Sequence, residues 1–179
     1  MNIEFDRVKI VKTGLIEFCS CMERSSENEL IIQYAVIAIH NALQGAVTVA
    51  LREADISDTW KNSHAKKWEN VELPKQLATG GMYQPDKFPQ LNVFMDLYDK
   101  YFNDKCNSID RERIENLNKH RNEFIHFNTD YLSIEKQWII DSCREGIEAI
   151  SHIVKEEKQL FGNEYNFFQE ILKEAKQKV

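Results

Sequence analysis

Three residues near the middle of the chain are of the types that could together cleave a phosphodiester bond. Arg121, Asn122 and His126 lie in the stretch NKHRNEFIHF, which runs from Asn118 to Phe127. An arginine can hold two phosphate oxygens at once, a histidine can move a proton near neutral pH, and an amide can orient either group. This set would act without a metal ion or another cofactor.

Arg121 occupies an unexpected position for a charged residue. At about 100° per residue, the apolar residues Ile114, Leu117, Phe124 and Ile125 form one stripe of a helix, and Arg121 falls inside that stripe. Burial of a guanidinium is unfavourable unless an anion or a set of acceptors meets it. We therefore expect Arg121 to have a partner.

The two outer members of the motif cannot act together on one straight helix, because His126 lies about 140° around the axis from Arg121. Two arrangements solve this problem. Either the helix ends near Phe124 and His126 swings inward, or two copies of the chain meet across a two-fold axis and combine their motifs. His120 lies about 240° from His126, and we expect it to be a solvent-exposed surface residue.

The elements that position these residues are predicted to be helices. Apolar residues at helical spacing predict a first helix from about Ile3 to Arg24 and a second that runs to about Ala54. Ser26 and Glu29 form a capping box that opens the second helix, and Ser133 can cap a later one.

No strand pattern appears in the chain, which indicates an all-α fold. We expect an antiparallel bundle of about five to six helices that forms a single domain over residues 1–179. One long loop is expected to be inserted at about residues 55–89, because all three prolines and the sequence TGG fall there.

Composition excludes several classes of protein. The 179 residues carry a net charge of −6, so any contact with nucleic acid must come from a local patch. The cysteines are Cys19, Cys21, Cys106 and Cys143, and no pair has the spacing of a metal site. The apolar run from Leu30 to Leu51 is interrupted by polar residues and is expected to be a buried helix, without membrane association. These features favour a cytoplasmic protein with reduced thiols.

The motif resembles that of the HEPN superfamily, in which an arginine is followed by a polar residue, three further residues and a histidine. Arg121, Asn122 and His126 match these positions, and a long core helix at Tyr34 to Leu51 fits the same pattern. The resemblance implies a helical bundle that forms a homodimer with a composite active site. It also implies a metal-independent endoribonuclease that acts as a toxin or a phage-defence effector.

RNA is the partner that this resemblance implies, and an antitoxin or another regulatory protein is a further one. The chain departs from one HEPN subgroup, in which a nucleotidyltransferase antitoxin modifies a tyrosine two residues after the histidine. Asn128 stands at that position, although Tyr131 lies nearby.

Two other groups of residues are candidates for substrate binding. His40, Asn41 and Gln44 form a polar streak that either lines the cleft or is satisfied within the bundle. Lys66 and Lys67 lie between two tryptophans, where they could bind phosphates beside stacked bases. The alternative for this segment is an amphipathic turn that packs its tryptophans on the bundle.

Two other interpretations of the chain remain open at this stage. In the first, a HEPN-like module binds RNA or a nucleotide, or scaffolds a partner, without catalysis. In the second, the bundle is unrelated and Arg121 forms a buried salt bridge with Asp141 or Glu145.

Overall fold

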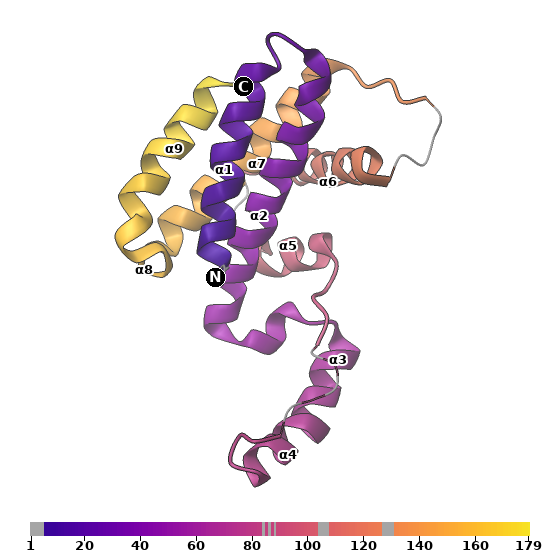
Figure 1. Ribbon diagram of the computed structural model, residues 1–179, viewed down its shortest axis with the longest axis vertical. Helices are drawn as coiled ribbons and strands as arrows, with labels where there is room; N and C mark the ends of the chain where they lie inside the picture. The colour runs from indigo at the N-terminus through magenta and orange to yellow at the C-terminus, as the bar shows by residue number, and fades with distance from the viewer. Residues whose placement is uncertain (1–5, 84, 86, 88, 104–107, 127–130) are drawn as a thin grey trace, which may run out of the picture.

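The computed structural model describes residues 6–83, 85, 87, 89–103, 108–126 and 131–179. The described residues form a bundle of long helices from which a small helical arm extends (Figure 1). No strand occurs among them, and one isolated antiparallel bridge joins Trp60 to Leu91. The predicted all-α bundle is confirmed.

Helix α2 (Ile32–Ala54) is the centre of the bundle. It packs along α1 (Arg7–Arg24) and also contacts α5 (Phe94–Phe102), α6 (Arg111–His126) and α7 (Lys136–Glu156). Glu29–Glu53 is long and apolar enough to cross a membrane, but half of its apolar window is buried inside the bundle. The apolar composition of this stretch is therefore explained by its central place in the core.

Small residues bring the core helices close together. A Cβ atom added at Gly14 of α1 would lie 2.9 Å from the Ala38 carbonyl oxygen of α2 and 2.9 Å from the Ala42 Cβ. One added at Gly146 of α7 would lie 2.9 Å from Leu117 Cδ2 of α6. Glycine at these two positions therefore sets the spacing of α1 and α6 within the bundle.

The C-terminal part of the chain covers the outer side of α1 and α7. After α8 (Lys158–Phe161) and a 3₁₀ turn at Gly162–Glu164, helix α9 (Tyr165–Gln177) runs alongside α1 (Figure 1). Its buried side chains include Phe168 and Leu172. These contacts leave α6 on the opposite side of the bundle from α9.

The segment predicted as a long loop is largely helical, which corrects that prediction. It contains a 3₁₀ turn (Ile56–Thr59), α3 (Asn62–Lys67), a π-helical turn (Trp68–Glu72) and α4 (Leu73–Ala78). These short helices form the arm (Figure 1). Pro85 and Pro89 follow the last of these helices, and Pro74 takes a first-turn position of α4, where its missing N–H is not needed.

Two of the predicted helix caps are wrong. The Ser26 hydroxyl donates to the Glu23 carbonyl, and Asn28 instead accepts from Leu30 N at the 3₁₀ turn (Glu29–Ile31) that precedes α2. Helix α7 begins at Lys136, and no side chain caps it. Neighbouring polar side chains compete for the same backbone groups, and this competition decides which of them caps a helix. The spacing of the residues alone does not predict the outcome.

Candidate functional site

Helix α6 carries the three residues of the predicted motif on different sides of its surface. Ile114 and Leu117 of α6 are fully buried against α2 and α7, and Arg121 follows them one turn later. Arg121 and Asn122 are half-buried, whereas His126 is exposed at the last residue of the helix. The helix thus places an arginine towards the core and a histidine towards solvent.

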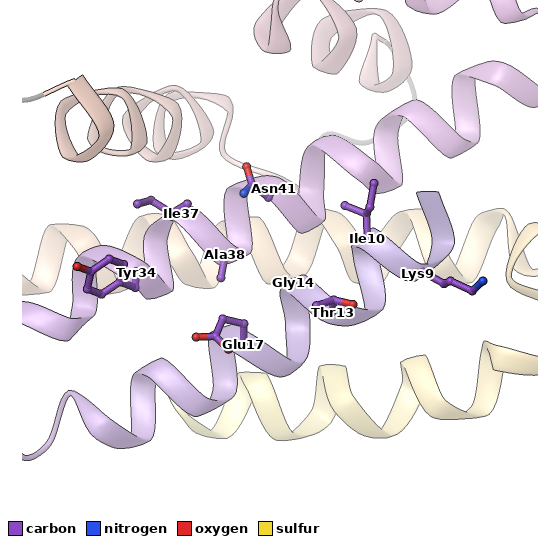
Figure 2. Close-up of a pocket in the computed structure, with 9 residues that line it drawn as sticks. All are labelled: Lys9, Ile10, Thr13, Gly14, Glu17, Tyr34, Ile37, Ala38 and Asn41. Atoms are coloured by element: carbon purple, nitrogen blue, oxygen red, sulfur yellow. The ribbon is translucent and has the colours of Figure 1, made fainter. Parts of the chain in front are cut away.

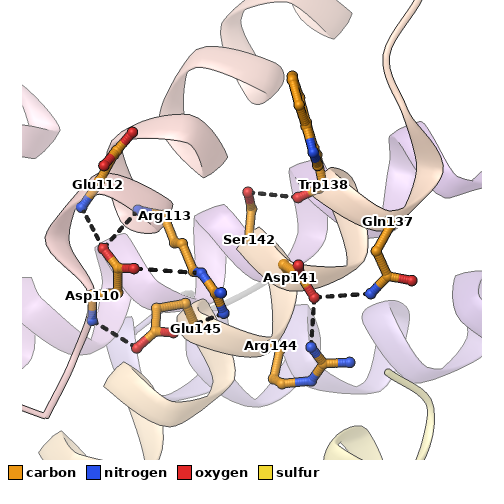
Figure 3. A network of polar contacts seen from close by, with 9 residues as sticks. All are labelled: Asp110, Glu112, Arg113, Gln137, Trp138, Asp141, Ser142, Arg144 and Glu145. Atoms are coloured by element: carbon orange, nitrogen blue, oxygen red, sulfur yellow. Dashed lines mark hydrogen bonds and ion pairs between the residues drawn. The ribbon is translucent and has the colours of Figure 1, made fainter.

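Arg121 forms no salt bridge with any residue that the structure describes. Its Nη1 donates to Asn122 Oδ1 at 2.8 Å, and its Nε is buried without a hydrogen-bond partner among those residues. The interpretation that Arg121 pairs with Asp141 or Glu145 is wrong. Asp141 accepts from Gln137 and Arg144, and Glu145 accepts from the Asp110 backbone, so both carboxylates have other partners (Figure 3).

His40 of α2 lies beside this arginine in the core. It is 1% exposed, its Nε2 lies 3.0 Å from Asn118 Oδ1, and its ring packs 4.5 Å from that of Phe94. Burial, and then the positive charge of Arg121, lower the pKa of His40 from 6.5 to about 4. His40 is therefore neutral at physiological pH.

One ring nitrogen of the neutral His40 has no hydrogen-bond partner among the described residues. Because the Asn118 carbonyl oxygen can only accept, Nε2 carries the proton, and the Nδ1 of His40 is a buried acceptor with no partner among the described residues. The Nε of Arg121 is a buried donor in the same situation. Buried polar atoms without partners are unfavourable, and they occur preferentially where a protein binds a ligand or performs chemistry.

The helix does not end at Phe124, because α6 continues to His126. The arrangement in which His126 swings inward within one chain is therefore wrong. The last turn of α6 points away from the other helices (Figure 1), and Ile125, which we predicted to lie on the apolar stripe, is 39% exposed. Phe124 still packs partly against the core.

The prediction that His120 lies exposed on the surface is also wrong. His120 is 6% exposed and faces α7, with its Nδ1 3.5 Å from Glu123 Oε2. Burial lowers the pKa of its imidazole, an effect that the Glu123 carboxylate opposes. The core-facing arc of α6 is wide enough to include His120, because α2 and α7 contact this helix together.

The predicted polar streak on α2 divides between two environments. His40 faces α6 and the core, whereas Asn41 and Gln44 face the groove between α1 and α2. This groove encloses about 240 Å³, and Asn41 also lines a neighbouring pocket of about 390 Å³ between the same two helices (Figure 2). The structure thus brings only His40 to Arg121.

Lys66 and Lys67 lie on α3 in the arm, away from α6 (Figure 1). Lys67 forms a salt bridge with Glu72 at 3.3 Å, and Lys66 is exposed. The neighbouring Trp60 and Trp68 pack against each other edge to face, with their ring centroids 5.5 Å apart. These two tryptophans therefore pack against each other.

No cluster of three or more potential metal ligands occurs in the part of the chain that the structure describes. Cys19, Cys21 and Cys143 are buried free thiols, and burial raises the pKa of Cys143 to about 12. Cys106 and Asn128 lie outside the described residues.

Asn118 is a site residue that the sequence interpretation missed. It links His40 to α6 and lies three residues before Arg121, so it shares a side of the helix with that arginine. The sequence did contain a signal for Asn118, because it is a polar residue about one helical turn before Arg121, the charged residue within the apolar stripe.

No protein-family model, no curated protein and no solved structure matches this chain significantly.

Proposed function

We propose that the protein is a metal-independent endoribonuclease that acts as a homodimer. The observation that carries this proposal is the half-buried guanidinium of Arg121, which no described carboxylate neutralises, on a helix that also presents Asn122 and an exposed His126. An arginine left without an acid is suited to hold a phosphate.

Each residue has a role in the proposed reaction. The ribose 2′-hydroxyl attacks the adjacent phosphorus, and the bond to the leaving 5′-oxygen breaks. His126 removes the proton from the 2′-hydroxyl, and the leaving 5′-oxygen takes up a proton from water or from the protonated His126. Arg121 stabilises the negative charge on the non-bridging oxygens, and Asn122, which accepts from Arg121, keeps the guanidinium in place. The products are a 2′,3′-cyclic phosphate and a 5′-hydroxyl.

The distribution of these groups on α6 supports the proposed dimer. Because the helix is continuous to His126, one chain cannot direct His126 and Arg121 at the same phosphate. A second copy, related by a two-fold axis, can supply the missing histidine. The last turn of α6, which extends beyond the other helices, and its exposed Ile125 could contact that copy.

The proposed biological setting is the cytoplasm, where the enzyme acts on cellular or phage RNA as a toxin or a defence effector. Such an enzyme requires a regulator, and an antitoxin protein is the proposed one. Tyr131, at 82% exposed, is accessible to a modifying partner a few residues beyond His126.

A second function is favoured by the same separation of Arg121 and His126. If the chain acts as a monomer, it presents an anion-binding arginine without a histidine able to reach the bound phosphate. It would then bind RNA or a nucleotide, or scaffold a partner, without cutting. Analysis of the RNA after incubation distinguishes the two functions, because only the enzyme would produce cleaved RNA.

The test is cleavage of an end-labelled structured RNA by the purified protein in EDTA. We expect the native protein to give cyclic-phosphate ends, and Arg121→Ala and His126→Ala each to lower the rate by about 100-fold or more. A 2′-deoxy substrate should resist cleavage, because the nucleophile is absent.

Arg24→Ala and His64→Ala are the matched controls, since they remove an exposed arginine and a histidine of the arm that lie outside the motif. Both should retain native activity. Absence of cleavage by the folded native protein across several RNAs would favour the binding function.

A further inference from the structure

A pocket between α6 and α7 is separate from the Arg121 cluster and has the features of a binding site. It encloses about 460 Å³, within the range of roughly 300–1,000 Å³ that small-molecule sites span. Asn116, Lys119 and His120 line it from α6, and Trp138 and Ser142 line it from α7. Figure 3 shows the α7 side of the pocket and the start of α6.

The charged groups at one end of this pocket are ion-paired, but carboxylates outnumber guanidiniums there. Arg113 lies 3.4 Å from Asp110 and 3.9 Å from Glu145, and Asp141 pairs with Arg144 at 2.6 Å (Figure 3). Glu112 also lines this end, which is therefore acidic and would not hold a phosphate, so a phosphate of the ligand must lie at the Lys119 side. A ligand of this pocket must be recognised mainly by shape, stacking and hydrogen bonds.

The groups that remain available are an aromatic ring, an amide and one cation. Trp138 is 64% exposed, and Asn116 forms no side-chain hydrogen bond with the described residues. Lys119 has no salt bridge with any of them. His120 adds a buried imidazole to the lining, with its Nδ1 3.5 Å from Glu123 Oε2.

This combination matches a nucleotide unit of single-stranded nucleic acid. An indole face stacks on a base regardless of its sequence, an amide can bond to a base edge, and a lysine neutralises a phosphate. Trp138 stands exposed at a polar pocket, so its indole face is accessible to a base that enters there.

The pocket lies along the same helix as the proposed catalytic residues. Lys119 and His126 are two helical turns apart, about 10 Å along the axis and within about 20° of the same side. A strand that follows this side of α6 would pass from the histidine to Lys119 and then to the pocket. We propose that the pocket holds a base of the RNA close to the cleaved phosphate, stacked on Trp138, with the adjoining phosphate on Lys119.

This inference rests on the proposed function for the identity of its ligand, RNA, but it does not require cleavage. The test therefore uses a 2′-O-methyl oligoribonucleotide, which lacks the attacking hydroxyl, and measures the Kd by fluorescence anisotropy. We expect Trp138→Ala to weaken binding by about fivefold or more and Trp138→Phe to retain most of the affinity. Lys119→Ala should weaken binding and make it less sensitive to salt.

An abasic scan identifies the stacked base. Removing the base at one position should raise the Kd for the native protein by about fivefold or more, and the same removal should have little effect on Trp138→Ala. Tyr34→Ala removes an exposed aromatic side chain of α2 that does not line this pocket, and is the matched control. It should bind like the native protein.

The outcomes separate this inference from the proposed catalysis. Trp138-dependent binding without cleavage of ordinary RNA would support the pocket and count against the enzyme. Cleavage, together with binding that is unchanged in Trp138→Ala, would overturn the pocket and leave the enzyme. Failure of the native protein to bind any oligonucleotide would also overturn the pocket.

Discussion

At the scale of single residues, His40 and Arg121 determine the charge of the candidate site. A buried imidazole lies beside a half-buried guanidinium, and burial first, then the charge of Arg121, lower the pKa of His40 so that the imidazole stays neutral. The arginine therefore remains the only cation of the pair at physiological pH. An anion that reaches it meets one fixed positive charge.

His40 makes stability depend on pH. Its folded pKa of about 4 lies below the unfolded value of 6.5, so between these values the unfolded chain binds more protons than the folded one. The free energy of unfolding should therefore fall as pH drops from 7 to 5, and His40 should account for about 2 kcal/mol of that loss.

Urea unfolding of the native protein and of His40→Gln at both pH values measures this contribution. Glutamine keeps a hydrogen-bonding group for Asn118 but does not titrate, so the variant should lose less stability on acidification. Equal losses in the two proteins would show that His40 does not carry the effect.

At the scale of the helices, the spacing of α1 and α2 depends on Gly14. Alanine at this mid-helix position would raise helix propensity by about 1 kcal/mol, but its methyl group would lie 2.9 Å from the Ala38 carbonyl oxygen. A backbone atom cannot move without shifting α2. We expect Gly14→Ala to lower Tm by roughly 3–6 °C, as followed by circular dichroism.

Gly45→Ala is the comparison for this variant. Its added methyl group would lie 3.0 Å from Val11 Cγ2, a side-chain atom that can adjust, so we expect a smaller change in Tm. A Gly14→Ala protein at least as stable as the native one would show that the two helices separate easily.

Much of the helical architecture could be predicted from the sequence, because apolar periodicity reports directly which faces are buried. The end of α2 at Ala54 and the interior position of Arg121 are examples. The environment of individual residues was harder to predict. His120 is buried because two helices contact α6 at once, and Ile125 is exposed because α6 extends past them. Both depend on tertiary packing, which periodicity does not encode.

At the scale of the whole molecule, the proposed dimer makes a prediction about mixtures of inactive variants. A homodimer of Arg121→Ala, or one of His126→Ala, has two inactive composite sites. A mixed dimer has one site with a native arginine from one chain and a native histidine from the other. Equal amounts of the two variants, allowed to exchange subunits, should recover up to about a quarter of native activity.

The measurement is the rate of RNA cleavage before and after mixing, with the oligomeric state followed by analytical ultracentrifugation. Arg121→Ala mixed with itself at the same total concentration is the control. Active protein with no recovery on mixing would place both groups of each site in one chain.

The bridge between Trp60 and Leu91 indicates where another domain can be inserted into the chain. Lys61 N donates to the Gln90 carbonyl at 3.0 Å, and Asn92 N donates to the Thr59 carbonyl at 2.9 Å, so the chain leaves and re-enters the bundle at one place. A fluorescent domain inserted at the exposed Gly80 and Gly81 turn would be carried on the arm, and the two bundle helices that flank it would keep their positions. The arm is thus a natural attachment point for following this protein in cells.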